Sequence, residues 1–419
     1  MQITPIAILT IYGVFLIIEI VVENLLTYLN IRYNATRKDT VPEKFTGEIG
    51  ATQYKKSIEY TLSKNKFSII SSIYQGSVIL IIVLTGALGT AEEWVSSFHL
   101  HPYVEGVLYV LGISFCFSLI QLPFSIYYQF VIEQRFGFNK QTPKLFVTDL
   151  IKSFFISGVL TAFLLLCVFW FLDFSGDLWW VFAFCAVACI QLAVTLLYPY
   201  IIAPIFNKFT PLEDENLKER VHNLAQSLGF PIAGVYVMDG SKRSSHSNAY
   251  FTGMGKLKRI VLFDTLLEKL ENPEIIAVLA HEIGHQKLGH IQKRIILSLF
   301  LLGTGFFVLQ LFIDFSPLFY AFGFTEASVH GLLVILSIAA GPFAFFLTPV
   351  ISLWSRKHEY EADRFAVRAM EGHEELESAL VTIGKDNLSN LTPHPLYSFF
   401  HYTHPALNER ISAIRKAKG

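Results

Sequence analysis

Charged residues are scarce in this chain of 419 residues, because Asp, Glu, Lys and Arg together make up only 16% of it. A soluble globular protein carries about 25% charged residues, so this shortage argues against a soluble protein. The formal net charge of −1 excludes the broad basic surface of a nucleic-acid-binding protein. Hydrophobic residues, in contrast, make up 53% of the chain, and 38 residues are Phe. This composition predicts an integral membrane protein that has no nucleic-acid partner.

Cysteine is also rare. The four cysteines, Cys116, Cys167, Cys185 and Cys189, all lie inside strongly apolar runs. We therefore interpret them as small buried hydrophobic residues and not as a disulfide or metal framework.

Long apolar runs are the most prominent feature of the chain. A membrane-spanning helix needs about 20 mostly apolar residues, and seven segments meet this requirement. These segments are residues 5–29, 68–90, 105–128, 150–173, 178–204, 295–317 and 331–353. No basic segment precedes the first of them, so we interpret it as a membrane span and not as a cleaved signal peptide.

The loops between these segments alternate between basic and non-basic composition. By the positive-inside rule, this alternation places the N-terminus outside the cell or in the lumen and the C-terminus in the cytosol. The two longest polar segments, 207–294 and 354–419, then lie together on the cytosolic side.

The first polar segment contains a metal-binding motif. Asn272 and Pro273 are typical of the N-cap and the first residue of a helix, which we expect to continue to residue 290. Within it, His281-Glu282-Ile283-Gly284-His285 is an H-E-x-x-H motif. Its spacing places His281 and His285 on one helical face, where both can bind one metal ion. Glu282 is suited to act as a general base on a water whose pKa zinc lowers to about 7.

A third metal ligand is expected from the second polar segment. His358, Glu359 and Glu361 are candidates of equal standing on spacing alone, and Asp363 shares a helical face with Glu359. A carboxylate beside the ligand can orient a metal-binding imidazole. His290 is expected about 140° around the helix from the second motif histidine, which places it outside the ligand set.

Short strands are predicted at residues 235–238 and 259–263, with an edge strand at Asn248, Ala249 and Tyr250 between them. An extended peptide could pair with the backbone of such an edge strand, which gives affinity without demanding particular side chains.

Two other classes of protein compete with a metallopeptidase. In a transporter or a seven-span receptor the H-E-x-x-H motif would be incidental. In an intramembrane protease the motif would lie within a span, but polar residues follow it directly: Gln286, Lys287, Gln292, Lys293 and Arg294. The predicted metal site therefore lies near the cytosolic face of the membrane.

Six segments of the sequence are similar to the signature segments of one family, the type I CAAX prenyl proteases. They are FGFNKQT (136–142), IIAPIFNKFTPL (201–212), KRSSHSNAYFTG (242–253), HEIGHQKLGH (281–290), SRKHEYEADRFA (355–366) and HYTHPALNERI (401–411). The resemblance implies a mainly α membrane protein, with seven transmembrane helices around a cavity. It also implies a gluzincin-like zinc metallopeptidase domain that carries a small β element.

The resemblance further assigns roles to individual residues. It implies one zinc ion per chain and makes Glu359 the third ligand. It makes Asp363 a carboxylate behind the ligands, with a possible second role as a proton donor, and it places His404 where an oxyanion would be stabilised. Arg410 would pair with a carboxylate of the site.

The resulting organisation has four parts. Residues 1–206 form five spans with cytosolic loops, and 207–294 form the first part of the metallopeptidase domain, with the substrate strand at Asn248. Residues 295–353 form the last two spans, and 354–419 complete the metallopeptidase domain.

The family removes the last three residues of prenylated CAAX proteins at the membrane, which implies membrane-associated substrates of this kind. The alternative is a quality-control zinc protease with non-prenylated substrates, like the bacterial heat-shock membrane protease, which has fewer spans. The compact chain is compatible with a bacterial source. The expected location is then the inner membrane, or the endoplasmic reticulum membrane in a eukaryote, with the active site towards the cytosol.

Overall fold

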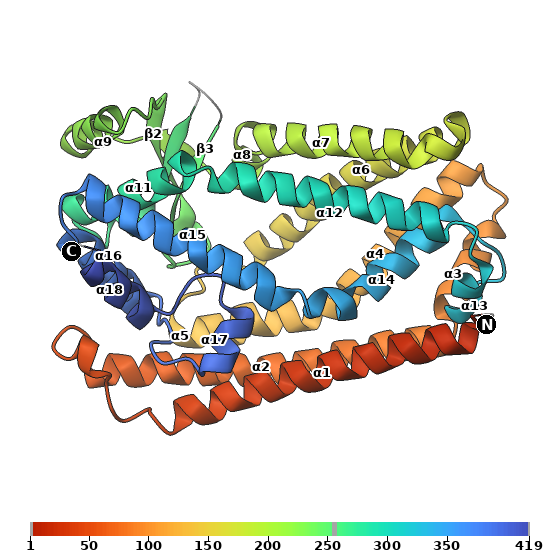
Figure 1. The fold of residues 1–419 in the computed structure, drawn as a ribbon, viewed down its shortest axis with the longest axis horizontal. Coiled ribbons are helices and arrows are strands. Elements are labelled where there is room, and N and C mark those ends of the chain that lie inside the picture. Colours follow the sequence, from red (N-terminus) through yellow and green to blue (C-terminus); the bar gives the residue numbers. More distant parts are fainter. Residues whose placement is uncertain (1–2, 254–257, 418–419) are drawn as a thin grey trace.

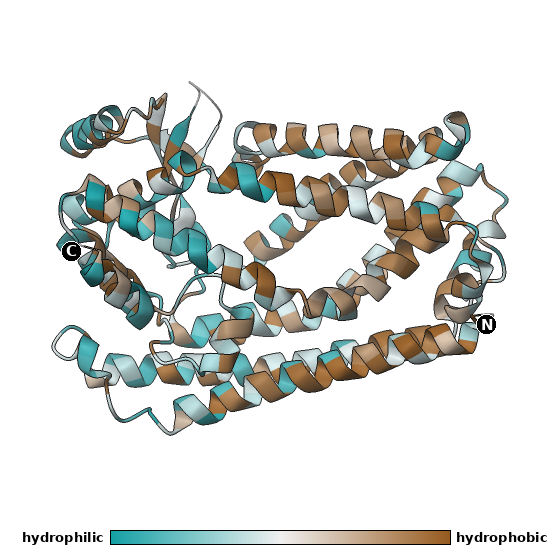
Figure 2. Cartoon of the chain, in the orientation of Figure 1, coloured by the Kyte–Doolittle hydropathy of each residue, from teal (hydrophilic) through white to brown (hydrophobic). Residues whose placement is uncertain are grey.

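The structure is a computed structural model that describes residues 3–253 and 258–417. Long helices run along the molecule and enclose its interior, and a small domain with a β-sheet lies at one end (Figure 1). The C-terminus lies at the end with the sheet, and the N-terminus lies at the opposite end. Hydrophobic residues cover the long helices, whereas hydrophilic residues concentrate at the end with the sheet (Figure 2).

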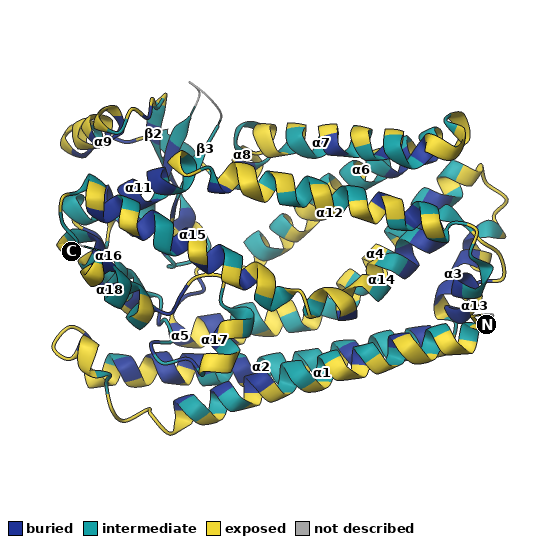
Figure 3. Cartoon of the chain, viewed as in Figure 1, coloured by how far each residue is buried: buried dark blue, intermediate teal, exposed yellow. Residues whose placement is uncertain are grey.

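Six helical segments of the described chain are long and apolar enough to cross a membrane. They are α1 (Pro5–Ala35), α2 (Ala51–Leu84), α4 continued by η2 and α5 (Pro102–Phe136), α6 (Pro143–Phe174), α7 with its flanking turns (Gly176–Phe206) and α12 (His290–Phe312). Many of their large apolar side chains are exposed on the outer faces, as expected of helices that contact lipid (Figure 3). The multi-span membrane fold predicted from the sequence is confirmed.

The seventh predicted span, at 331–353, is not one straight helix. It is divided into α14 (Val329–Phe345) and α15 (Thr348–Ala369), which meet at an angle of 65°. Pro349 stands in the first turn of α15, and a residue before proline is sterically disfavoured in the α conformation. The bend turns α15 towards the domain with the sheet, where it carries the second half of the candidate site (Figure 1).

Proline and a capping residue start three of the long helices. The side chain of Thr4 accepts a hydrogen bond from Ala7 N before Pro5, and that of Thr142 accepts one from Leu145 N before Pro143. His101 and Pro102 begin α4 in the same way. These caps satisfy backbone donors that a helix leaves unpaired at its start.

The small sheet contains four strands in the order β1-β2-β4-β3. The strands are β1 (Phe209–Pro211), β2 (Gly234–Met238), β3 (Ala249–Thr252) and β4 (Arg259–Phe263). β2 and β4 are parallel, and the two outer pairs are antiparallel. The sequence predicted β2, β4 and the edge position of β3, but it did not predict β1.

Helices complete this domain. They are α9 (Glu215–Ser227), α10 (Asp264–Leu267), α11 (Asn272–Lys287), α16 (Glu374–Asp386), α17 (Pro395–His401) and α18 (Leu407–Lys416). Buried side chains of α9, α10, α11, α16 and α18 form one hydrophobic core with the sheet and with the end of α15, and its centre includes Ile260, Leu262, Leu279 and Ile283. The far end of the molecule is closed by two short helices, α3 (Ala87–Ser96) and α13 (Ser316–Ala321).

The interior between the long helices contains several cavities. An apolar cavity of about 1040 Å³ is lined by residues of α1, α6, α7, α12 and α14. A more polar cavity of about 540 Å³ lies between α1 and α2 and includes Glu19 and Gln75. One prediction about the spans is wrong: Cys116, Cys185 and Cys189 are exposed on their helices and not buried.

Candidate metal centre

The first half of the centre lies on α11. The helix begins with a capping box, in which the side chain of Glu274 accepts a hydrogen bond from Glu271 N at 2.9 Å. The N-cap is therefore Glu271, whereas Asn272 was predicted from the sequence. Gly284 allows α11 to approach α15 closely, because a Cβ atom there would lie 3.1 Å from Phe365 and 3.3 Å from Ala362.

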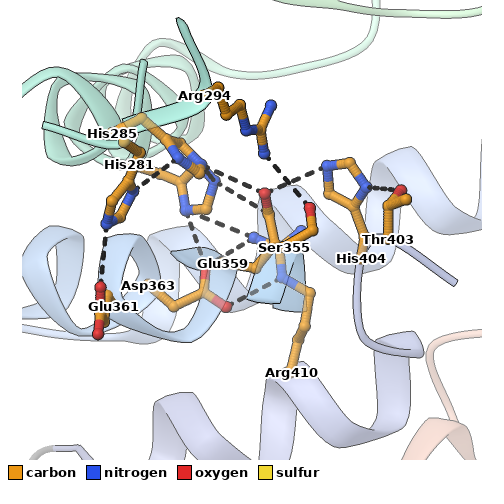
Figure 4. Close-up of polar contacts among 11 residues, drawn as sticks. His281, His285, Arg294, Ser355, Glu359, Glu361, Asp363, Thr403, His404 and Arg410 are labelled. Carbon is orange, nitrogen blue, oxygen red and sulfur yellow. Dashed lines mark hydrogen bonds and ion pairs between the residues drawn. The ribbon is translucent and has the colours of Figure 1, made fainter. Parts of the chain in front are cut away.

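This close approach brings three side chains to one point. The Nε2 atoms of His281 and His285 lie 3.1 Å apart. Carboxylate oxygens of Glu359 lie 3.5 Å from the first Nε2 atom and 3.4 Å from the second. Figure 4 shows both imidazoles on α11 directed at Glu359 on α15.

These spacings fit a divalent metal ion. At tetrahedral zinc with bonds of about 2.0–2.1 Å, the ligand atoms lie about 3.3–3.4 Å from one another. Glu359 is only 2% exposed, and its Oε2 atom has no hydrogen-bond donor among the described residues. Burial without a donor is costly for a carboxylate oxygen, and a metal ion would remove this cost. Three protein ligands also leave the fourth position of a tetrahedral site open for water or substrate.

A carboxylate and a guanidinium support the first imidazole. Asp363 Oδ1 lies 2.9 Å from His281 Nδ1, so a proton on Nδ1 leaves the Nε2 lone pair directed at the centre. Arg410 donates two hydrogen bonds to Asp363, of 2.9 Å from Nε and 2.6 Å from Nη2. This bidentate pair, in which Asp363 is buried and Arg410 is largely buried, holds the Asp363 carboxylate in place.

The second imidazole has a different support. His285 Nδ1 lies 3.0 Å from His290 Nδ1, and His290 Nε2 lies 3.0 Å from Glu361 Oε2. The prediction that His290 lies far around a continuous helix from His285 is wrong. Helix α11 ends at Lys287, and Gly289 adopts a left-handed conformation with φ +69°. The chain therefore turns there, and α12 begins with His290 directed back at His285.

These contacts distinguish the three candidates for the third ligand. Glu359 faces the two motif histidines, and Glu361 binds His290. The His358 ring stacks on the His290 ring at a centroid distance of 4.0 Å. His290, His358 and Glu361 also form a compact group that could hold a metal ion by distance alone.

Glu282 is half-buried on α11 between the two histidines in sequence. Burial raises the pKa of Glu282 above its ordinary value, although the charges of His281 and His285 oppose this shift. A carboxylate whose pKa is raised is a better proton acceptor than an exposed one, which suits a general base.

His404 reaches the centre from the loop before α18. Its Nε2 atom lies 3.3 Å from Glu359 Oε1, and its side chain is 63% exposed. Arg356 holds the start of this loop, because it donates hydrogen bonds to the carbonyl oxygens of Ser398 and Phe399 in α17 and of Tyr402 directly after it. This role of Arg356 was not predicted, because it depends on contacts with a segment more than 40 residues later in the chain.

The predicted substrate strand lies at the open edge of the sheet. Residues Ala249 to Thr252 form β3, which pairs with β4 on one side only. Asn248 precedes the strand and is exposed, with its side chain accepting a hydrogen bond from Ala249 N. Tyr250 is half-buried. β3 also contacts α11, so its free edge and the motif helix belong to one region of the domain.

Known proteins resemble this chain over almost its whole length. Residues 30–208 match the family model described as CAAX prenyl protease N-terminal, five membrane helices, and residues 211–418 match that of Peptidase family M48. The CAAX prenyl protease 1 homolog of Arabidopsis thaliana is 37% identical, with 96% of each chain covered. CAAX prenyl protease 1 of Saccharomyces cerevisiae is 38% identical, with 96% of this chain and 93% of the other covered.

A solved structure agrees with this result. The crystal structure of S. mikatae Ste24p superposes with a TM-score of 0.91 at 33% identity, over 99% of this chain and 100% of the other. All three of these proteins are eukaryotic, whereas the compactness of the chain was compatible with a bacterial source.

Proposed function

This chain belongs to peptidase family M48 as a membrane metalloendopeptidase of the CAAX prenyl protease type, and we propose that it uses one zinc ion to remove the C-terminal tripeptide of prenylated proteins. The observation that carries the proposal is the set of distances of 3.1 to 3.5 Å among His281 Nε2, His285 Nε2 and the Glu359 carboxylate. These three residues hold the ion. When bound, zinc supplies an electrophile for the scissile carbonyl and makes a water molecule more acidic.

The residues around the metal ligands then have distinct tasks. Glu282 accepts the proton of the attacking water and returns it to the amine that leaves, as its buried position and raised pKa favour. His404 donates a hydrogen bond to the oxyanion that develops on the carbonyl oxygen, which the position of its Nε2 atom beside Glu359 supports. Asp363 and Arg410 keep His281 in the tautomer that binds the metal through Nε2.

The substrate extends along β3. Its backbone pairs with the free edge at Asn248, Ala249 and Tyr250, so that affinity comes from main-chain hydrogen bonds. The peptidase domain consists of residues 207–294 and 354–419, joined through the spans of 295–353, and residues 1–206 contribute the other spans. The active site faces the cytosol, and in a eukaryotic cell the protein lies in the endoplasmic reticulum membrane.

The test is cleavage of a farnesylated CAAX peptide by the full chain purified in detergent, with and without a zinc chelator. We expect release of the C-terminal tripeptide, measured by mass spectrometry, loss of release with the chelator, and recovery when zinc is added back. If the peptide stays intact although one zinc ion is bound per chain, the CAAX specificity is wrong. Cleavage of a misfolded, non-prenylated membrane protein under the same conditions would then identify a quality-control protease.

A further inference from the structure

A pocket of about 510 Å³, lined by both polar and apolar residues, extends from the candidate centre to the helices α1 and α2. His404 and Arg410 line it at the side of the centre, and Asn30, Lys64 and Asn65 line it at the side of the two helices. This volume is in the range of sites that bind small ligands. The pocket therefore joins residues of the proposed peptidase site to polar residues far away in sequence.

Lys64 contributes a cation that forms no direct salt bridge with the described residues, although the charge of Glu133 acts on it from a longer distance. Its Nζ atom lies 4.7 Å from the centre of the Tyr60 ring, and no carboxylate oxygen of the described residues lies within 4.0 Å of it. The acidic residue in this region, Glu133, is already bound at both oxygens, by Tyr60 at 2.5 Å and by His246 at 3.2 Å. Half-buried ammonium groups are costly without a partner, so an anion in the pocket would stabilise Lys64.

Two buried amides add unused donors to the same pocket. Asn30 is 1% exposed and Asn65 is 6% exposed, and the Nδ2 atom of each lacks an acceptor in the described part of the chain. The orientation of Asn30 is fixed, because its Oδ1 atom accepts hydrogen bonds from His394 N at 2.9 Å and from Asn34 Nδ2 at 3.0 Å. A buried amide N–H group without an acceptor is destabilising, and a ligand oxygen would remove this cost.

We propose that this pocket binds the free α-carboxylate at the C-terminus of the substrate, with Lys64 as the counter-ion and Asn30 and Asn65 as hydrogen-bond donors. The inference rests on the proposed function, in which the scissile bond lies three residues before the end of the chain. Three extended residues span about 10 Å, so the C-terminus of a substrate that is cleaved three residues before its end lies away from the metal ligands. A carboxylate supplies a negative charge for Lys64 and acceptor oxygens for the amides of Asn30 and Asn65. A C-terminal amide supplies no charge.

The experiment compares a free C-terminal carboxylate with its amide in two measurements on the full chain in detergent. The first is kcat/KM for a farnesylated CAAX peptide in each form. The second is direct binding of the tripeptide Val-Ile-Ala in each form to the zinc-loaded protein. In both measurements we expect the acid to be favoured about tenfold or more, because a charge pair removed from bulk water is a strong contact.

Substitutions on α2 test which residue binds the C-terminal carboxylate of the substrate. In Lys64→Met the ratio of acid to amide should fall to near one, and Lys64→Arg should restore most of it. Lys66→Met is the matched control, because Lys66 is exposed on the same helix and does not line this pocket, so the ratio should stay at its original value. If the pocket instead binds an anionic lipid headgroup and not the substrate carboxylate, the acid and the amide should bind alike and the ratio should be near one in the unaltered protein, which would overturn the proposal.

Each result decides one of the two proposals. Equal binding of the acid and the amide tripeptide, or an unchanged ratio in Lys64→Met, overturns the carboxylate site even if the CAAX peptide is cleaved. Preferential binding of the acid that depends on Lys64 supports the site, whereas failure to cleave either peptide counts against the CAAX specificity alone.

Discussion

The Nδ1 atoms of His285 and His290 lie 3.0 Å apart, so one of them must carry the proton that the other accepts. If His285 binds the metal through Nε2, its proton is on Nδ1 and is donated to His290 Nδ1. The second proton of a neutral His290 is then on Nε2, which lies 3.0 Å from Glu361 Oε2 and donates to it. Each donor in this chain of contacts has one acceptor.

This arrangement of protons predicts one metal ion per chain. The group of His290, His358 and Glu361 has suitable distances for a second ion, but His290 Nε2 has no lone pair to offer while His285 is a ligand. Elemental analysis of the purified protein should therefore find about one zinc ion per chain. Two ions, with the second lost in Glu361→Gln, would show that His290 is a ligand and that the proton assignment is wrong.

Removal of His290 should weaken metal binding. In His290→Phe the Nδ1 proton of His285 loses its acceptor, and loss of such a partner typically lowers metal affinity 10- to 100-fold. The affinity is measured by competition with a chromophoric chelator. His358→Phe is the control, because His358 contacts His290 by stacking and not by a hydrogen bond, so it should change the affinity little. Equal losses in both variants would show that packing, and not the hydrogen bond, matters.

Glu282→Gln should abolish turnover without loss of the metal. Glutamine keeps the shape of the side chain but cannot accept the proton of the attacking water, and general-base catalysis contributes about 10²- to 10⁴-fold to a rate. We expect kcat to fall by about this factor while the zinc content stays near one per chain. Glu268→Gln, at an exposed position outside the site, should keep the original rate. An active Glu282→Gln variant would contradict the role given to this residue.

Much of the architecture could be predicted because its signals are local. Hydropathy over about 20 residues locates the spans, and the spacing of four in H-E-x-x-H places two imidazoles on one face. The length of α2 was missed, since its polar first half, residues 51–67, continues the helix beyond the apolar run. β1 was missed because it has three residues and owes its conformation to pairing with β2.

The choice among His358, Glu359 and Glu361 could not be made from spacing. It depends on how α15 is rotated about its axis relative to α11, which the contact of Gly284 with Ala362 and Phe365 determines. The position of His290 depends on the left-handed backbone at Gly289, which ends one helix before the next begins. Both are properties of the packed structure, and only the family resemblance could anticipate the first.

The pair of Asp363 and Arg410 should contribute strongly to stability. The Asp363 side chain is 2% exposed and that of Arg410 is 12% exposed, and removal of one partner from a buried ion pair typically costs about 3–5 kcal/mol, because the other charge is left without compensation. Arg410→Met should therefore lower the unfolding temperature in detergent clearly. Arg415→Met, on the same helix, removes an arginine that is 47% exposed and paired with Glu377, so it should cost at most about 1 kcal/mol. Similar shifts for the two variants would show that the Asp363 carboxylate is compensated by other groups.

The distance between α11 and α15 should control the metal site. In Gly284→Ala the new methyl group would lie 3.1 Å from Phe365 and 3.3 Å from Ala362, so the helices must separate by a few tenths of an ångström. The two histidines then move away from Glu359, and we expect zinc affinity to fall about tenfold or more, because metal ligation tolerates errors of only about 0.2 Å. Gly305→Ala on α12 is the control, since a Cβ atom there has no neighbour within 4 Å in the described structure. Unchanged zinc affinity in Gly284→Ala, together with a lower unfolding temperature, would mean that Glu359 follows α11 when the helices separate.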